Sequence, residues 1–164
     1  MPTIELDQIT TIVQGFIDQW IKFESNLHKE LAKTHPLSQK NINGETQAED
    51  NYGLFYRVSS IIQTRDRVTM GDFSGALSIP FSKATRIINW LFANGYVKRM
   101  DDSHDRRVVL IALTDKGSEL YRVIDNFTRE RVEQLLSSGL NSEEKVIFFT
   151  LINKVVVAIK KAAQ

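Results

Sequence analysis

Side chains that can donate or accept hydrogen bonds recur at three- and four-residue steps between Pro80 and Asn94. Residues at these steps share one face of a helix. Ser, Thr, Asn and Arg side chains can reach base edges or phosphates of nucleic acid, and Lys binds phosphates as a point charge. No acidic residue occurs between Gly75 and Met100, although composition alone leaves a solvated helix face equally possible. The residues concerned are Ser82, Lys83, Thr85, Arg86 and Asn89.

Basic residues also gather around a β-hairpin that is predicted to follow this helix. Tyr96–Met100 and Arg107–Leu113 are rich in aliphatic and β-branched residues, and the polar stretch 101–106 separates them. Arginine at an exposed hairpin tip can enter the minor groove of DNA. Charged residues at a hairpin tip also prevent its strands from pairing with strands of other chains. For a charged hairpin considered alone, this protection is a commoner explanation than DNA binding. The basic residues are Lys98, Arg99, Arg106 and Arg107.

The elements that must position these side chains have signals of their own. An apolar stripe at i, i+3, i+4 and i+7 predicts one buried face for the helix 80–94, where proline is tolerated in the first turn and Gly95 marks the end. Ahead of it, Thr69 followed by Asp72 resembles the cap of a short helix. Short helix, tight connection, second helix and hairpin, in this order, are typical of a winged helix-turn-helix. The stripe consists of Ala84, Ile87, Ile88 and Leu91.

Four further helices are predicted outside this unit. Apolar residues recur at helical spacing over about 4–33, 52–63, 115–136 and 141–161, with Thr114 and Asn141 as caps of the last two. The chain from His35 to Asn51 turns polar and is expected to form an exposed loop. The predicted fold class is therefore mainly α with a small β-hairpin wing, in a single domain over 1–164.

The first and last predicted helices are more apolar than one buried stripe requires. A helix that is apolar over most of its circumference must be buried from several sides. A monomer of 164 residues offers too little material to cover two such helices. We therefore expect a homodimer held by dimerisation helices in 1–34 and 115–164, flanking a winged helix-turn-helix DNA-binding region in 52–114.

Composition and charge narrow the class of protein. Net charge is +1, but residues 51–107 carry 9 basic and 5 acidic residues, whereas residues 1–50 carry 4 and 8. The absence of cysteine excludes disulfides and thiolate metal sites. No apolar run approaches the roughly 18 residues of a membrane span, and the start lacks the pattern of a signal peptide. We expect a cytoplasmic protein without membrane contact.

Catalytic and cofactor patterns are missing, so neither an enzyme nor a bound cofactor is expected. The sequence has no G-x-S-x-G elbow and no Gly-rich phosphate loop. Among His28, His35 and His104, only His28 has a carboxylate at ligand spacing (Glu24), so we expect no metal site. Several aromatic residues could line a cavity for a small-molecule effector, although ordinary core packing is the commoner explanation of their spacing. They are Phe16, Trp20, Phe55 and Tyr56, with Trp90.

The segment from Asp105 to Gly117 contains the pattern D-x-R, five residues, L-T, one residue, K-G. It resembles the wing signature of the multiple-antibiotic-resistance regulator (MarR) family of bacterial winged-helix regulators. The preceding Gly-Tyr-Val-Lys-Arg at 95–99 is similar to that family's G-L-V-x-R, and the helix order extends the resemblance to nearly the whole chain. The resemblance implies that Arg107 enters the minor groove, that Asp105 pairs with and orients Arg99, and that the first and last helices form a dimer.

One departure from the family pattern lies at the start of the second helix. The family usually has a small hydroxyl residue as the cap there, whereas this chain has Ile79-Pro80-Phe81. We expect Ser78 to be the substitute cap.

Together these observations predict a sequence-specific regulator of transcription that binds double-stranded DNA as a homodimer. Its operator would be pseudo-palindromic, because two-fold symmetry repeats the same contacts. Repression relieved by a small-molecule effector is the expected mode of action. The alternative is a winged-helix dimer that serves as a protein–protein interaction module.

Overall fold

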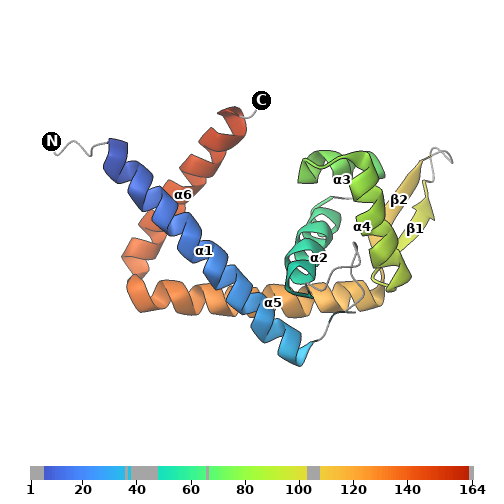
Figure 1. The fold of residues 1–164 in the computed structure, drawn as a ribbon, viewed down its shortest axis with the longest axis horizontal. Coiled ribbons are helices and arrows are strands. Elements are labelled where there is room, and N and C mark those ends of the chain that lie inside the picture. The colour runs from blue at the N-terminus through green and yellow to red at the C-terminus, as the bar shows by residue number, and fades with distance from the viewer. Residues whose placement is uncertain (1–5, 36, 38–47, 66, 103–107, 163–164) are drawn as a thin grey trace. The chain divides into compact units, whose positions relative to one another are not determined.

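The computed structural model describes residues 6–35, 37, 48–65, 67–102 and 108–162. Within these ranges, six helices and a two-stranded hairpin follow one another in the predicted order (Figure 1). The chain divides into two compact units, Met1–Asp125 and Asn126–Gln164, which are described separately. The predicted fold class, mainly α with a small β-hairpin wing, is confirmed. The elements are α1 Leu6–Thr34, α2 Ala48–Gln63, α3 Met70–Leu77, α4 Phe81–Ala93, β1 Val97–Asp101, β2 Val109–Leu113, α5 Asp115–Gly139 and α6 Ser142–Ala162.

The first unit is built around an apolar core shared by α2, α3, α4 and the hairpin. The predicted stripe of α4 is confirmed, since all four of its residues are buried. Phe55 of α2 packs edge-on against Tyr96, with ring centroids 5.2 Å apart. Phe73 of α3 and Ile111 of β2 close the core from the other elements. Burial of this apolar surface is the main stabilising force for the unit.

The turn between α3 and α4 differs from the sequence prediction at one residue. The predicted capping box of α3 is confirmed: Thr69 accepts a hydrogen bond from the backbone of Asp72, whose carboxylate accepts one from Thr69 N–H. Ser78, however, is not the cap of α4. It is the C-cap of α3, in a left-handed conformation with φ 51°, and Pro80 is the N-cap of α4 without a side-chain hydrogen bond. The N-cap residue of a helix has its backbone in the β region, whereas the left-handed conformation of Ser78 is that of a helix end.

The hairpin is the wing of the fold, and an isolated β-bridge that the sequence did not indicate joins its second strand to the residues before α3. β1 and β2 pair antiparallel, with Val97 opposite Leu113 and Asp101 opposite Val109. Thr69 forms a bridge to Leu110, and Ile111 N–H donates to the carbonyl of Val68 at 2.9 Å. The residues just before α3 therefore attach the helix-turn-helix to the second strand of the wing.

Hydrogen bonds of the Tyr52 hydroxyl link the segment after α1 to α2. Tyr52 is fully buried, and its hydroxyl donates to the carbonyl of His35 and accepts from Leu37 N–H at 2.9 Å. Burial raises the pKa of this phenol. α2 begins at Ala48 rather than at Tyr52, so the helix takes in four residues that were predicted as loop. The polar character of 48–51 concealed a helical first turn, because polar residues are common there.

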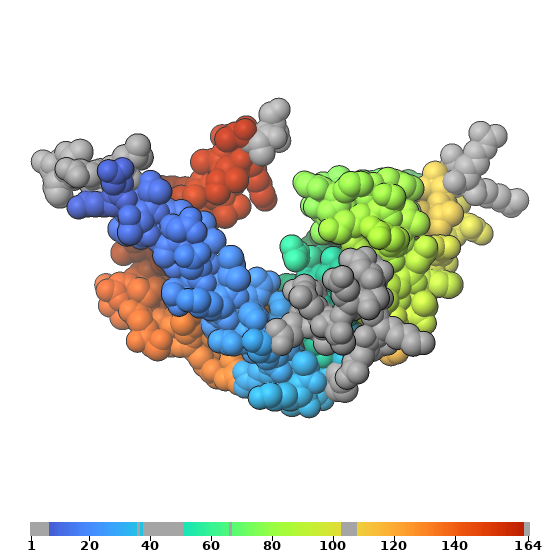
Figure 2. Space-filling view, in the orientation of Figure 1, coloured from blue at the N-terminus to red at the C-terminus, as the bar shows by residue number. Residues whose placement is uncertain are grey.

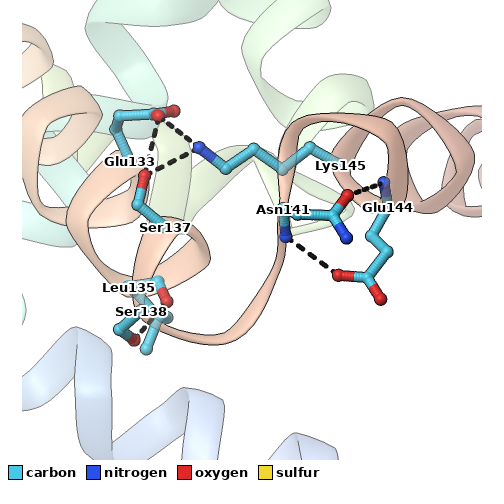
Figure 3. A network of polar contacts seen from close by, with 7 residues as sticks. All are labelled: Glu133, Leu135, Ser137, Ser138, Asn141, Glu144 and Lys145. Atoms are coloured by element: carbon cyan, nitrogen blue, oxygen red, sulfur yellow. Dashed lines mark hydrogen bonds and ion pairs between the residues drawn. The ribbon is translucent and has the colours of Figure 1, made fainter.

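The second unit contains the last part of α5 and α6, which meet at a polar corner (Figure 3). Lys145 Nζ donates to Glu133 Oε1 and Ser137 Oγ, both at 2.7 Å. The ion pair with Lys145 lowers the pKa of Glu133. The predicted cap Asn141 is confirmed, because it exchanges hydrogen bonds with Glu144. α5 continues to Gly139, whereas the sequence predicted its end at about Leu136.

Within the ranges that the structure describes, no helix has the length and apolarity needed to span a bilayer.

Candidate nucleic-acid interface

The outer face of α4 is polar and open to solvent. Ser82, Lys83, Arg86 and Asn89 are exposed, whereas Thr85 is half-buried. Thr85 Oγ1 donates to the carbonyl of Phe81 at 2.9 Å, so its proton is used inside the helix. Figure 2 shows α3 and α4 as a green surface with the strands in yellow beside it. Four of the five residues predicted on this helix thus present their side chains to solvent on one element.

Arg99 of the wing is bonded to α4. Its Nη2 donates to Oδ1 of Asn89, and its guanidinium carbon lies 5.3 Å from the ring centre of Phe92. The two predicted site residues Asn89 and Arg99 are therefore in direct contact. The pairing of Arg99 with Asp105, which the family resemblance implied, lies outside the described residues, as do the predicted contacts of Arg106 and Arg107.

The base of the wing is fixed by an ion pair that sequence reasoning missed. Asp102 has a side chain only 1% exposed, and it pairs with the guanidinium of Arg67, which is 56% exposed. Asp102 N–H also donates to the carbonyl of Val108 at 3.1 Å, across the last described rung of the hairpin. A buried carboxylate requires a partner of this kind. Its signal in the sequence was an acidic pair, 101–102, within an otherwise basic segment.

The Thr-x-Lys-Gly segment after the wing joins α5 to the end of α4. Thr114 Oγ1 donates to the carbonyl of Gly95 at 2.6 Å and accepts from Gly117 N–H at 3.1 Å. Lys116 Nζ donates to the carbonyl of Asn94 at 2.8 Å and lies 4.6 Å from the ring centre of Tyr96. Gly95 has φ 73°, a conformation that favours glycine. This segment therefore fixes where the wing leaves α4.

The four aromatic residues predicted for an effector lie in different surroundings. Phe16 and Trp20 stack on each other on an exposed part of α1, with ring centroids 6.0 Å apart. Phe55 is fully buried against Tyr96 in the core. Tyr56 stacks on Tyr121 of α5, and its hydroxyl donates to Asp125 at 2.7 Å. The structure thus brings Phe16 together with Trp20 and assigns Phe55 to the core.

The histidines do not form a metal centre in the part of the chain that the structure describes. His28 stacks near Tyr52, with ring centroids 6.2 Å apart, and His35 is hydrogen-bonded with Thr34. No group of three or more His, Cys, Asp or Glu side chains that could hold a metal occurs among the described residues. His104 lies outside them.

Comparison with known proteins gives this arrangement its context. No protein-family model matches the chain. The multiple antibiotic resistance protein MarR of Escherichia coli is 25% identical over 100 residues, which are 61% of this chain and 69% of that protein. The HTH-type transcriptional regulator BilQ of Clostridium symbiosum is 28% identical over 102 residues, 62% of this chain and 69% of BilQ. The resemblance to the MarR family is confirmed. The solved structure of FabT of Streptococcus pneumoniae in complex with DNA matches 96% of this chain and 99% of its own, with a TM-score of 0.70 at 18% identity. The two proteins therefore share a fold over almost the whole chain.

Proposed function

We propose that this protein is a MarR-type transcriptional regulator that binds double-stranded DNA sequence-specifically. The observation that carries the proposal is the exposed face of α4, which presents hydrogen-bond donors without any acidic residue and lies beside a basic wing. An α-helix fits the major groove, where each base pair has its own pattern of donors and acceptors. The solved FabT structure in complex with DNA supports this use of the fold.

Three exposed residues of α4 and the tip of the wing have proposed contacts with DNA. Ser82 and Arg86 contact base edges from the face of α4, and Lys83 binds phosphates from its flank. The wing enters the flanking minor groove, where a narrow groove attracts arginine. For its tip, the proposed contacts are Arg107 in the groove and Arg106 at the backbone, with Asp105 orienting a basic neighbour.

Homodimerisation is proposed from the apolar surfaces of α1 and α6. Large apolar residues on both helices are exposed in the single chain, and every described residue from Thr150 to Ala162 is exposed. Apolar patches of this extent are rare on monomers and mark interaction surfaces. A two-fold dimer would bury them and repeat α4 about one DNA turn away, which requires a pseudo-palindromic operator.

Repression relieved by a small molecule is the proposed mode of regulation. Because Phe55 is enclosed in the core, Phe16, Trp20 and Tyr56 are those of the four predicted aromatic residues that an effector could contact without opening that core.

The proposal is tested by fluorescence anisotropy with duplex DNA from the promoter region of the protein's own operon. We expect binding that is tighter than to a scrambled duplex of equal length and composition. The logarithm of affinity should fall with the logarithm of salt concentration, with a slope of about −0.9 for each phosphate contacted. Equal affinity for both duplexes would contradict the proposal and favour a protein-interaction module.

A further inference from the structure

Two residues just ahead of α3 contact both strands of the wing. The carbonyl of Val68 accepts a hydrogen bond from Ile111 N–H of β2 at 2.9 Å. The guanidinium of Arg67 pairs with the carboxylate of Asp102, the residue that follows β1. This short segment therefore links β2 through its backbone and the end of β1 through a side chain, directly before α3.

The two members of the ion pair lie in very different surroundings. The side chain of Asp102 is 1% exposed, and an unpaired charge in such a place is strongly unfavourable. The side chain of Arg67 is 56% exposed, so water can solvate its guanidinium in the absence of the carboxylate. Removing Arg67 therefore leaves a buried charge without this cation, and the carboxylate must move toward water. Removing the charge of Asp102 leaves only an exposed arginine.

Asp102 also closes the hairpin at its outer end. Its N–H donates to the carbonyl of Val108 at 3.1 Å, one step beyond the last strand pair, Asp101 with Val109. In the sequence, Asp102 and Val108 flank residues 103–107, which include the wing-tip contacts proposed above. A carboxylate that moves toward water takes its own backbone with it. The bond between Asp102 and Val108 should then open more often.

We propose that Arg67 is a positioning residue for DNA binding, which acts through Asp102 to hold the outer end of the wing in its binding arrangement. This inference rests on the proposed function, because it concerns the wing of the same DNA-binding surface. The alternative role is a direct contact, since an exposed arginine can bind phosphates. The carboxylate beside it favours the positioning role, because a nearby negative charge weakens the attraction of the guanidinium for a phosphate.

The first experiment examines the free full-length protein by amide hydrogen exchange. The variant Arg67→Met is compared with wild type and with the control Arg65→Met, which removes the same charge from an exposed residue two positions away. The Asp102 amide should exchange at least about tenfold faster in Arg67→Met only, because its bond within the hairpin opens more often. The Ile111 amide of β2 should be unchanged in all three proteins. Equal exchange of the Asp102 amide in wild type and Arg67→Met would overturn the proposal.

The second experiment measures affinity for the promoter duplex by anisotropy. Each protein is first shown to be folded by circular dichroism, so a loss of stability alone leaves the affinity unchanged. Arg67→Met should bind at least about tenfold more weakly than wild type, within the range for losing one wing contact. In the Asp102→Asn background, the same substitution should change the affinity by less than about threefold, because no buried charge remains to be exposed. The salt slope should be the same with and without Arg67.

The outcomes separate this inference from the proposed function. If wild type binds the promoter and scrambled duplexes equally, sequence-specific binding fails and the inference fails with it. If wild type discriminates but Arg67→Met weakens binding equally in both backgrounds and reduces the salt slope by about 0.9, Arg67 is a phosphate contact and its positioning role is refuted. Equal affinities of Arg67→Met and Arg65→Met also refute it.

Discussion

Gly117 is the position where the structure predicts the largest effect of a single methyl group. A Cβ atom added to it would lie 2.9 Å from the carbonyl carbon of Tyr96, still closer to its oxygen, and 3.3 Å from a methyl of Leu113. Real Cβ atoms essentially never approach other atoms within 3.0 Å. The obstacle is backbone, so no change of rotamer relieves it. Gly117→Ala must therefore move α5 away from the turn between α4 and β1.

The size of the effect follows from the bonds at this junction. Overpacking typically costs about 1–3 kcal/mol. Moving α5 also strains the hydrogen bonds that Thr114 makes, through N–H to Tyr96 at 3.0 Å and through Oγ1 to Gly95, each contributing about 1 kcal/mol. The higher helix propensity of alanine compared with glycine offsets about 1 kcal/mol of this loss. The net loss should be about 2–4 kcal/mol, or about 4–16 °C in Tm for a chain of this length.

The assay is urea unfolding followed by circular dichroism at one fixed protomer concentration, because dimer stability depends on concentration. The matched control is Gly139→Ala in the same helix, where nothing lies within 4 Å of the added Cβ atom. It should leave stability unchanged or raise it by up to about 1 kcal/mol. A Gly117→Ala protein within about 0.5 kcal/mol of wild type would refute the reasoning, since ordinary surface substitutions fall in that range.

Four further predictions concern other parts of the molecule. The hydrogen bonds that Thr69 donates, from its backbone N–H and its hydroxyl, lower the pKa of Asp72 below the ordinary value of 3.8. The ionised Asp72 carboxylate therefore contributes its full stabilisation of the folded protein above pH 3.8, and this contribution is lost as the pH falls through the lowered pKa. Thermal melts should therefore show Asp72→Asn less stable than wild type by about 1 kcal/mol at pH 7, with the difference shrinking below pH 3.8. In anisotropy titrations, Arg86→Ala should reduce discrimination between operator variants, whereas Lys83→Ala should weaken binding to all duplexes and reduce the salt slope by about one. If Arg86→Ala lowered the affinity for operator and random DNA equally, Arg86 would not contact bases. Arg107→Ala should weaken operator binding by about 1–3 kcal/mol per subunit with the fold intact by circular dichroism, and wild-type affinity would contradict its role in the minor groove. Deleting the residues after Leu140 should abolish dimerisation in sedimentation experiments together with DNA binding, and a truncated protein that still dimerises would show that α6 is not needed.

Local signals in the sequence predicted the helices and their order. The buried stripe of α4 repeats with the period of a helix, and the caps Thr69 and Asn141 lie three residues before their acidic partners. Such features depend on residues within one or two turns, so the sequence contains all the information they need. The polar outer face of α4 was predictable for the same reason.

Contacts between distant parts of the chain were not predictable. Arg67 and Asp102 are 35 residues apart, and although the acidic pair 101–102 stands out in a basic segment, nothing in the sequence indicates which cation it contacts. Arg99 was expected to have a carboxylate partner by resemblance, and its amide partner Asn89 became visible only when β1 was placed against α4. Ser78 was misassigned because a serine between two helices can end one or begin the other, and its backbone conformation decides.

The bonds around the base of the wing have a thermodynamic consequence. Arg67 with Asp102 links the segment before α3 to the end of β1, Arg99 with Asn89 links β1 to α4, and Lys116 with Asn94 links α5 to the end of α4. Association through these described elements then has little conformational entropy to lose, and they should add no contribution of coupled folding to the heat capacity change on binding. The association rate constant should then be governed by diffusion and charge, because the described part of the surface does not have to change conformation to bind.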